Sequence, residues 1–119
     1  MDSEAMLELA KKALEDIKAR DVVVLDVRKL TSVTDYLLVA SGTSDRHARS
    51  IADNLIEEAK SAGVKPLGVE GQDGGEWILV DLQDVVVHVM QAATRDFYKL
   101  EDLWRVDGSK LAEGATSDI

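Results

Sequence analysis

Apolar residues recur at helical spacing in two long segments of the chain. In residues 3–20 and again in residues 44–62, an apolar side chain follows every three or four positions, with polar residues between. This spacing places the apolar side chains along one face of a helix. An Asp, Ser or Thr stands at the start of each segment, and these residue types cap helix N-termini. We therefore predict two amphipathic helices.

Short apolar runs rich in β-branched residues account for most of the remaining sequence, and turn-forming residues separate them. They predict five strands, over residues 22–27, 36–40, 66–69, 77–80 and 85–90. The last two runs are joined at Gln83-Asp84, a connection short enough to imply an antiparallel hairpin. The second and third strands, joined through the second helix, should form a right-handed parallel crossover if they lie side by side.

A third helix is predicted over residues 92–104, with Phe97 and Tyr98 among its packing positions. Gly, Ser, Ala, Thr and charged residues dominate residues 107–119, so we predict a disordered tail after a single domain of residues 1–106. The order of helices and strands indicates an α/β fold. We expect a mixed β-sheet of about five strands flanked by helices.

The chain is strongly acidic, with a net charge of −9 among its 119 residues. Such a chain gains nothing from counterion release, so direct nucleic-acid binding is not expected. An acidic surface suits a basic protein partner, although the charge can equally serve solubility alone. The sequence has no cysteine and no apolar run long enough to span a membrane, and its first residues lack the basic and apolar segments from which we would expect a signal peptide. These features favour a cytoplasmic protein without membrane contact.

Residues that could support catalysis are few. Ser41 to Ser44 form a turn before a helix, but the second glycine and the lysine of a phosphate-binding loop are absent, so a turn with a helix cap is the preferred interpretation. A nucleotidyltransferase would need two acidic residues on one strand to hold Mg²⁺, and no predicted strand carries them. His47 and His88 are distant and lack an acidic cluster. We predict no enzyme, cofactor or metal site.

Trp77 and His88 lie in the predicted hairpin. A tryptophan at the start of a strand serves equally often as a core edge or as an interface anchor. Strand alternation places His88 on the same face as Val86 and Met90, and we expect it to be partly buried and hydrogen-bonded.

Several sequence motifs, taken together and in order, resemble the ribosomal silencing factor family, also called the Iojap family. The motif residues are 34–44, 46–47, 50–53, 67–71, 76–77, 81, 84–90 and 95–104. The resemblance implies a mixed-sheet α/β fold of nucleotidyltransferase-like topology without the catalytic acids. It also implies binding to the fourteenth protein of the large ribosomal subunit, on the face that meets the small subunit. The bound protein would block subunit joining sterically and repress translation when nutrients are short.

This resemblance and the residue types together define the candidate partner-binding residues, which are Trp77, Glu70, Asp81, Tyr98, Asp35, His88 and Arg95. We expect Trp77 to be an aromatic anchor, Glu70 and Asp81 to pair with basic side chains, and Tyr98 to add aromatic area. The other three match family motifs and could equally be structural. An exposed sheet edge or apolar face could make the free protein a homodimer. A degenerate or active nucleotidyltransferase and a general acidic adaptor remain the alternatives.

Overall fold

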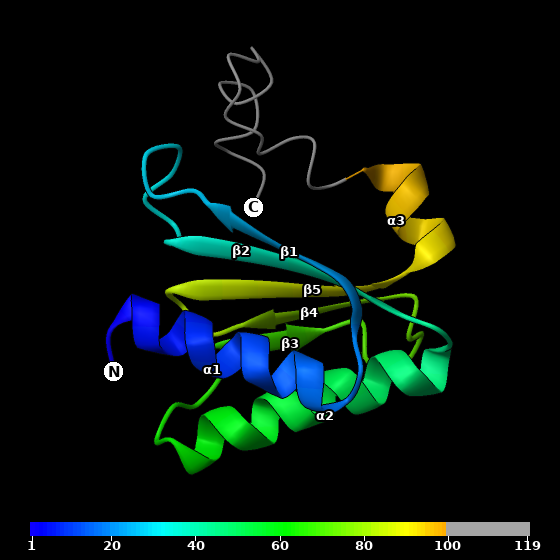
Figure 1. Cartoon of the computed structure of the whole chain (residues 1–119), viewed down its shortest axis with the longest axis horizontal. Helices are drawn as coiled ribbons and strands as arrows, with labels where there is room; N and C mark the ends of the chain where they lie inside the picture. The colour runs from blue at the N-terminus through cyan, green and yellow to red at the C-terminus, as the bar shows by residue number, and fades with distance from the viewer. Residues whose placement is uncertain (100–119) are drawn as a thin grey trace.

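A five-stranded mixed sheet organises residues 1–99, the part of the chain that the computed structural model describes (Figure 1). In chain order the elements are α1 (Ser3–Asp16), β1 (Arg20–Asp26), β2 (Tyr36–Gly42), α2 (Asp45–Ser61), β3 (Gly68–Glu70), β4 (Trp77–Asp81), β5 (Val85–Gln91) and α3 (Ala92–Tyr98). The strands of this described part lie in the spatial order β1-β2-β5-β4-β3, and among its neighbouring strand pairs only β2 and β5 run parallel. The predicted α/β class and five-stranded mixed sheet are confirmed, whereas the relation to nucleotidyltransferases stays a prediction.

Both long helices begin at a side-chain cap. The Asp2 carboxylate accepts a hydrogen bond from the Ala5 N–H at 2.8 Å, and the Ser44 hydroxyl accepts one from the His47 N–H at 3.0 Å. The predicted end of α1 at residue 20 is wrong. The helix ends at Asp16 because Lys18 has a φ of 59°, a left-handed conformation that a right-handed helix does not contain.

The predicted hairpin of β4 and β5 is confirmed, since the two strands pair antiparallel with Ile78 opposite Val89. The strands on either side of α2, β2 and β3, do not lie side by side, because β4 and β5 lie between them. The predicted parallel crossover, which required neighbouring strands, is therefore not formed. The predicted end of α3 is also wrong: Lys99 has a φ of 49° and its N–H bonds to the Arg95 carbonyl, which ends the helix at Tyr98. The rest of that prediction and the predicted tail lie outside the described residues.

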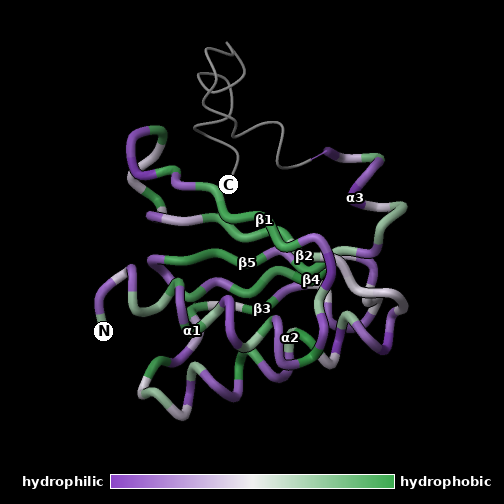
Figure 2. The backbone as a smooth tube through the Cα atoms, viewed as in Figure 1, coloured by the Kyte–Doolittle hydropathy of each residue, from purple (hydrophilic) through white to green (hydrophobic). Residues whose placement is uncertain are grey.

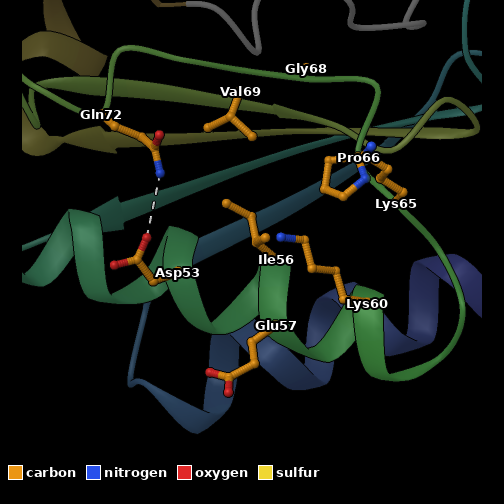
Figure 3. Close-up of a pocket in the computed structure, with 9 residues that line it drawn as sticks. All are labelled: Asp53, Ile56, Glu57, Lys60, Lys65, Pro66, Gly68, Val69 and Gln72. Atoms are coloured by element: carbon orange, nitrogen blue, oxygen red, sulfur yellow. Dashed lines mark hydrogen bonds between the residues drawn. The ribbon is translucent and has the colours of Figure 1, made fainter.

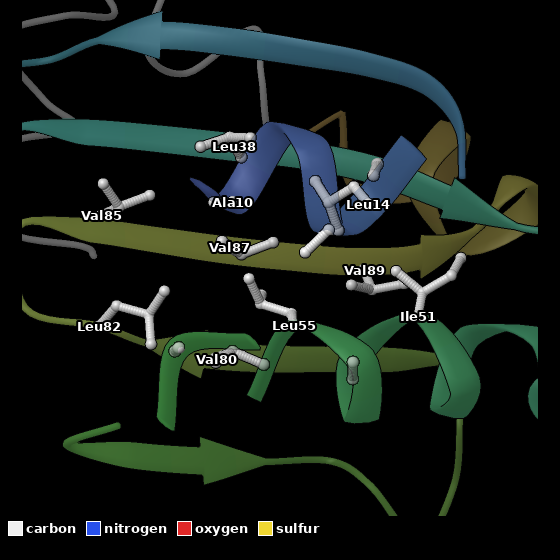
Figure 4. Packing of buried hydrophobic residues seen from close by; sticks show 14 of the residues in the cluster. Ala10, Leu14, Leu38, Ile51, Leu55, Val80, Leu82, Val85, Val87 and Val89 are labelled. Carbon is white, nitrogen blue, oxygen red and sulfur yellow. The ribbon is translucent and has the colours of Figure 1, made fainter. Parts of the chain in front are cut away.

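Helices α1 and α2 cover one face of the sheet, as Figure 1 shows. The tube in Figure 2 alternates between hydrophobic and hydrophilic along both helices and is mostly hydrophobic through the central strands. The core beneath the helices is aliphatic, and its fully buried side chains include Leu14, Leu38, Ile51, Leu55, Val80 and Val87 (Figure 4). This core fixes the sheet, and the sheet in turn positions the residues on its opposite face.

Candidate partner-binding surface

Strand β4 presents its alternate residues to the face that α1 and α2 leave open. Ile78 and Val80 belong to the core beneath the helices. Because side chains alternate along a strand, Trp77, Leu79 and Asp81 lie on the opposite face. That opposite face is called the open face below.

The indole ring of Trp77 is held in place by contacts on the open face. Its Nε1–H donates a hydrogen bond of 2.8 Å to Nδ1 of His88, and the two ring centroids are 5.8 Å apart. The half-buried ring also packs against a small cluster formed by Val39 and Met90. Trp77 is therefore oriented by both a hydrogen bond and apolar contact, while part of its surface stays accessible.

His88 is buried and uncharged at neutral pH. Only 5% of its surface is exposed, and burial lowers the pKa of its imidazole from 6.5 to about 4. Its Nδ1 accepts the hydrogen bond from Trp77, so the neutral ring carries its proton on Nε2. His88 is hydrogen-bonded, as predicted. It cannot offer a charge to a partner at neutral pH, and its contact with the indole gives it a positioning role.

Helix α3 adds two aromatic rings, of which one contacts Trp77. The Tyr98 ring centroid lies 4.9 Å from that of Trp77, and the Phe97 ring meets Tyr98 edge-on at 5.0 Å. Their exposed fractions are 52% for Tyr98 and 79% for Phe97. The prediction that these two side chains serve packing is therefore wrong for Phe97 and incomplete for Tyr98. We call Trp77, Phe97 and Tyr98 the aromatic surface.

Helix α3 is anchored by a buried arginine. Arg95 is 7% exposed, and its Nη1 donates a hydrogen bond of 2.9 Å to the Ser41 hydroxyl at the end of β2. Gln91, just before the helix, donates through its side-chain amide to the Gly75 carbonyl at 3.0 Å and to the Asp45 carboxylate. These bonds hold α3 against β2, the loop before β4 and the start of α2, and so position its aromatic side chains.

The loop before β4 depends on glycine. Gly71 has a φ of +86°, and a Cβ atom there would lie 2.0 Å from the Trp77 carbonyl oxygen. Gly75 has a φ of +71°, and a Cβ atom there would lie 2.9 Å from the Asp45 Cβ. Side chains at either position would force the backbone apart. The two glycines therefore let the loop lie close to the start of β4 and to α2.

Glu70 and Asp81, two of the acidic residues predicted as partner contacts, differ in their surroundings. Glu70 pairs with Leu79 across β3 and β4, so it shares the open face with Trp77, and it is exposed. Asp81 lies on the same face, but its carboxylate accepts a hydrogen bond of 2.8 Å from the Gln83 N–H and so stabilises the hairpin turn.

Asp35 lies apart from the others. It precedes β2, and its N–H bonds to the Asp84 carbonyl at the start of β5. Trp77 instead pairs with Met90, near the other end of β5. The structure therefore brings six of the seven predicted residues to the open face or to α3 beside it, but Asp81 pairs with Val86 and so lies, like Asp35, at the end of the strands away from Trp77. Phe97 is the residue that sequence reasoning missed as a surface contact, because helical spacing alone does not say which helix face meets the sheet.

The second histidine has a structural role. The Nδ1 atom of His47 accepts a hydrogen bond of 2.9 Å from the Thr43 N–H, and its Nε2 atom lies 2.7 Å from the Ile17 carbonyl oxygen. His47 therefore ties the end of α1 to the start of α2. Within residues 1–99 there is no group of three or more His, Cys, Asp or Glu side chains arranged to hold a metal ion. No helix in this part of the chain is long and apolar enough to cross a membrane.

Known proteins resemble this chain over most of its length. A ribosomal silencing factor RsfS from Chromobacterium violaceum is 45% identical over 115 residues, which cover 97% of this chain and 94% of that protein. A crystal structure of a Chromobacterium violaceum protein matches the fold with a TM-score of 0.86 at 43% identity, covering 93% of this chain and 98% of that one. A Mus musculus protein named mitochondrial assembly of ribosomal large subunit protein 1 is 33% identical over 101 residues, covering 82% of this chain and 44% of that protein.

A family model described as ribosomal silencing factor during starvation matches residues 1–118. The match therefore extends over both the sheet and the helix that carry the aromatic surface. It agrees with the resemblance seen in the sequence motifs, and the chain belongs to the ribosomal silencing factor (RsfS) family.

Proposed function

We propose that this protein represses translation by binding the large ribosomal subunit and blocking its association with the small subunit. Its contact on the ribosome would be the fourteenth large-subunit protein, the partner that the family resemblance implies. The aromatic surface on the open face is the single observation that carries the proposal, because it provides a preformed patch of the composition that protein interfaces favour.

The aromatic surface has the properties of an interface anchor. Trp77 is oriented by its bond to His88, so little side-chain freedom would be lost when a partner covers it. Tyr98 contacts the indole and Phe97 contacts Tyr98, and both are exposed, so their combined area would be buried together. Interfaces concentrate binding energy in such buried aromatic groups.

Charge supports a basic partner. The chain carries a net charge of −9, and the exposed Glu70 lies on the open face. Complementary charge raises association rates and selects against acidic competitors. A basic ribosomal protein fits this surface better than the phosphate backbone of RNA, which an acidic chain repels.

The names of relatives support the ribosomal connection. The Chromobacterium violaceum relative is named a ribosomal silencing factor, and the Mus musculus relative is named for the assembly of the ribosomal large subunit. For this chain, we infer that silencing requires no catalysis. A folded domain docked on the joining face excludes the other subunit by volume, and the effect follows its occupancy, hence its concentration relative to the dissociation constant. Such a protein would act in the cytoplasm, and the free protein could self-associate through the same apolar area.

Co-sedimentation tests the proposal directly. Purified protein is mixed with isolated large subunits, with isolated small subunits, or with neither, and each mixture is separated on a sucrose gradient. We expect the protein in the large-subunit fraction only. Light scattering then measures subunit joining, which added protein should reduce in a dose-dependent manner. Absence from the large-subunit fraction, or unchanged joining at saturating occupancy, would contradict the proposal.

A further inference from the structure

A cleft of about 460 Å³ lies between α2 and the edge strand β3 (Figure 3). Asp53 and Lys60 belong to its α2 wall, Val69 belongs to β3, and Pro66 lies just before that strand. Val69 packs toward the helices, whereas its neighbour Glu70 is on the open face. The cleft is therefore separate from the aromatic surface, and nothing in the proposed function uses it.

The cleft separates opposite charges along its length. Lys60 and Lys65 lie at one end, Asp53 lies at the other, and Ile56 and Val69 lie between them in Figure 3. Among residues 1–99, neither lysine forms an ion pair with a carboxylate. The two cations and the carboxylate are therefore available to a ligand, with an apolar floor between them.

Glu57 and Gln72 complete the polar lining. The Glu57 carboxylate points away from the cleft in Figure 3, so it does not neutralise the lysine end. Gln72 donates a long hydrogen bond of 3.5 Å to Asp53, a contact weak enough for a competing donor to replace. The acidic end thus keeps acceptor capacity for a cationic group.

The backbone spacing along α2 gives an upper range for the length of a matching ligand, because the Lys60 side chain extends back toward Ile56 in Figure 3. Asp53 and Lys60 are seven residues apart on the helix, which corresponds to about 10 Å along its axis. An extended peptide of three residues spans roughly 10 Å, and one of two residues spans about 7 Å. The lysine side chain is long and flexible enough to accommodate either length.

We propose that this cleft binds short zwitterionic peptides of two or three residues with apolar side chains. The terminal carboxylate bonds to Lys60 and Lys65, the terminal ammonium bonds to Asp53, and the side chains cover Ile56 and Val69. Charge-assisted hydrogen bonds at both ends orient the ligand, and apolar contact between them adds affinity. A ligand with an anion alone meets a repulsive carboxylate at the far end of the cleft.

Calorimetry with the whole protein tests the site. The probe is the tripeptide Leu-Ala-Leu, and its matched control is the same tripeptide acetylated at the N-terminus and amidated at the C-terminus. We expect saturable one-to-one binding of the free tripeptide at micromolar to millimolar concentrations. The capped control should bind at least about tenfold more weakly, because it lacks both terminal charges. This pair of ligands needs no variant, so folding is not in question.

Variants then locate the site. The double variant Lys60→Gln/Lys65→Gln should weaken binding by at least about tenfold and Asp53→Asn by at least about threefold, whereas Lys29→Gln, an exposed lysine outside the cleft, should leave affinity unchanged. Absence of binding at millimolar tripeptide would overturn the proposal. Equal affinity for the capped peptide would also overturn it. Binding only of a longer peptide, independent of its termini, would show strand addition at β3 instead.

Discussion

The two faces of the sheet bury their side chains by different means. Beneath α1 and α2, aliphatic residues such as Leu55 and Val87 pack without polar partners. On the open face, buried positions include His88 and Arg95, and each side chain has a hydrogen-bond partner from another element. The helix-covered face is therefore organised by apolar packing, whereas the open face combines small apolar clusters, such as Val39 with Met90, with directed polar contacts.

The two faces therefore contribute differently to folding stability and to partner binding. The aliphatic side chains beneath α1 and α2 stabilise the fold, but they are covered by these helices and so cannot contact a partner. The polar bonds of the open face contribute less net stability, since each replaces bonds to water. They do fix the directions of Trp77 and α3, which ordinary apolar packing would leave less defined. We therefore expect substitutions on the two faces to have separable effects on folding and on ribosome binding.

The largest expected effect is on the helix-covered face. Leu55 is fully buried between α2 and the sheet, so Leu55→Ala should lower the free energy of unfolding by about 2–5 kcal/mol. Chemical denaturation measures the loss. The fraction that remains folded should bind large subunits with unchanged affinity. Weaker binding by that folded fraction would show that the two faces are coupled.

The next effect concerns His88 and pH. The pKa of its imidazole is about 4 in the folded protein and near 6.5 when the chain unfolds, so the unfolded state binds more protons between these values. The contribution is fully present above pH 6.5 and is lost as pH falls toward 4. The total change should be up to about 3 kcal/mol.

Denaturation across this pH range, compared with His88→Gln, isolates the contribution. The glutamine keeps an acceptor for the Trp77 N–H but has no proton to gain. We expect the stability difference between the two proteins to vary with pH in the stated direction. Identical pH profiles would mean that His88 is not held neutral by burial.

Trp77 tests the binding face itself. Trp77→Ala should raise the dissociation constant for large subunits at least about tenfold, equivalent to about 1.4 kcal/mol or more. Its ring is half-buried, so the loss of folding stability should be smaller than for Leu55→Ala. Trp77→Phe is the matched control, since it keeps an aromatic ring but removes the bond to His88. A collapse of stability by about 3–5 kcal/mol with normal binding of the folded fraction would place Trp77 in the core.

The smallest effect is expected at Glu70. It is exposed at the edge of the open face, where solvent screens its charge, so Glu70→Gln should change affinity less than about threefold. The change should appear mainly in the association rate and should fade with added salt. Surface plasmon resonance at two salt concentrations measures it against Glu58→Gln, an exposed glutamate on α2. A larger, salt-independent loss at Glu70 would indicate a buried pair with the partner.

Local sequence determined the elements of the fold. Apolar periodicity located α1 and α2, and alternating or continuous apolar runs located all five strands to within a few residues. Residue type predicted a cap at the start of each long helix, at Asp2 or Ser3 and at Thr43 or Ser44, and the structure selects Asp2 and Ser44. The ends of α1 and α3 were misplaced, because left-handed turns at Lys18 and Lys99 leave no mark in residue type.

Tertiary structure alone decided which of these residues meet. Strand order cannot be read from periodicity, so the insertion of β5 between β2 and β4 was not foreseeable. The hairpin of β4 and β5 was predicted, but only its register, with His88 opposite Leu79, brings the imidazole within reach of the Trp77 indole. The docking of α3 through Arg95 and Ser41, which are 54 residues apart, likewise depends on a long-range contact. Residue types and spacings act over a few positions of the chain, whereas the aromatic surface and the α2–β3 cleft exist only because distant segments are packed together.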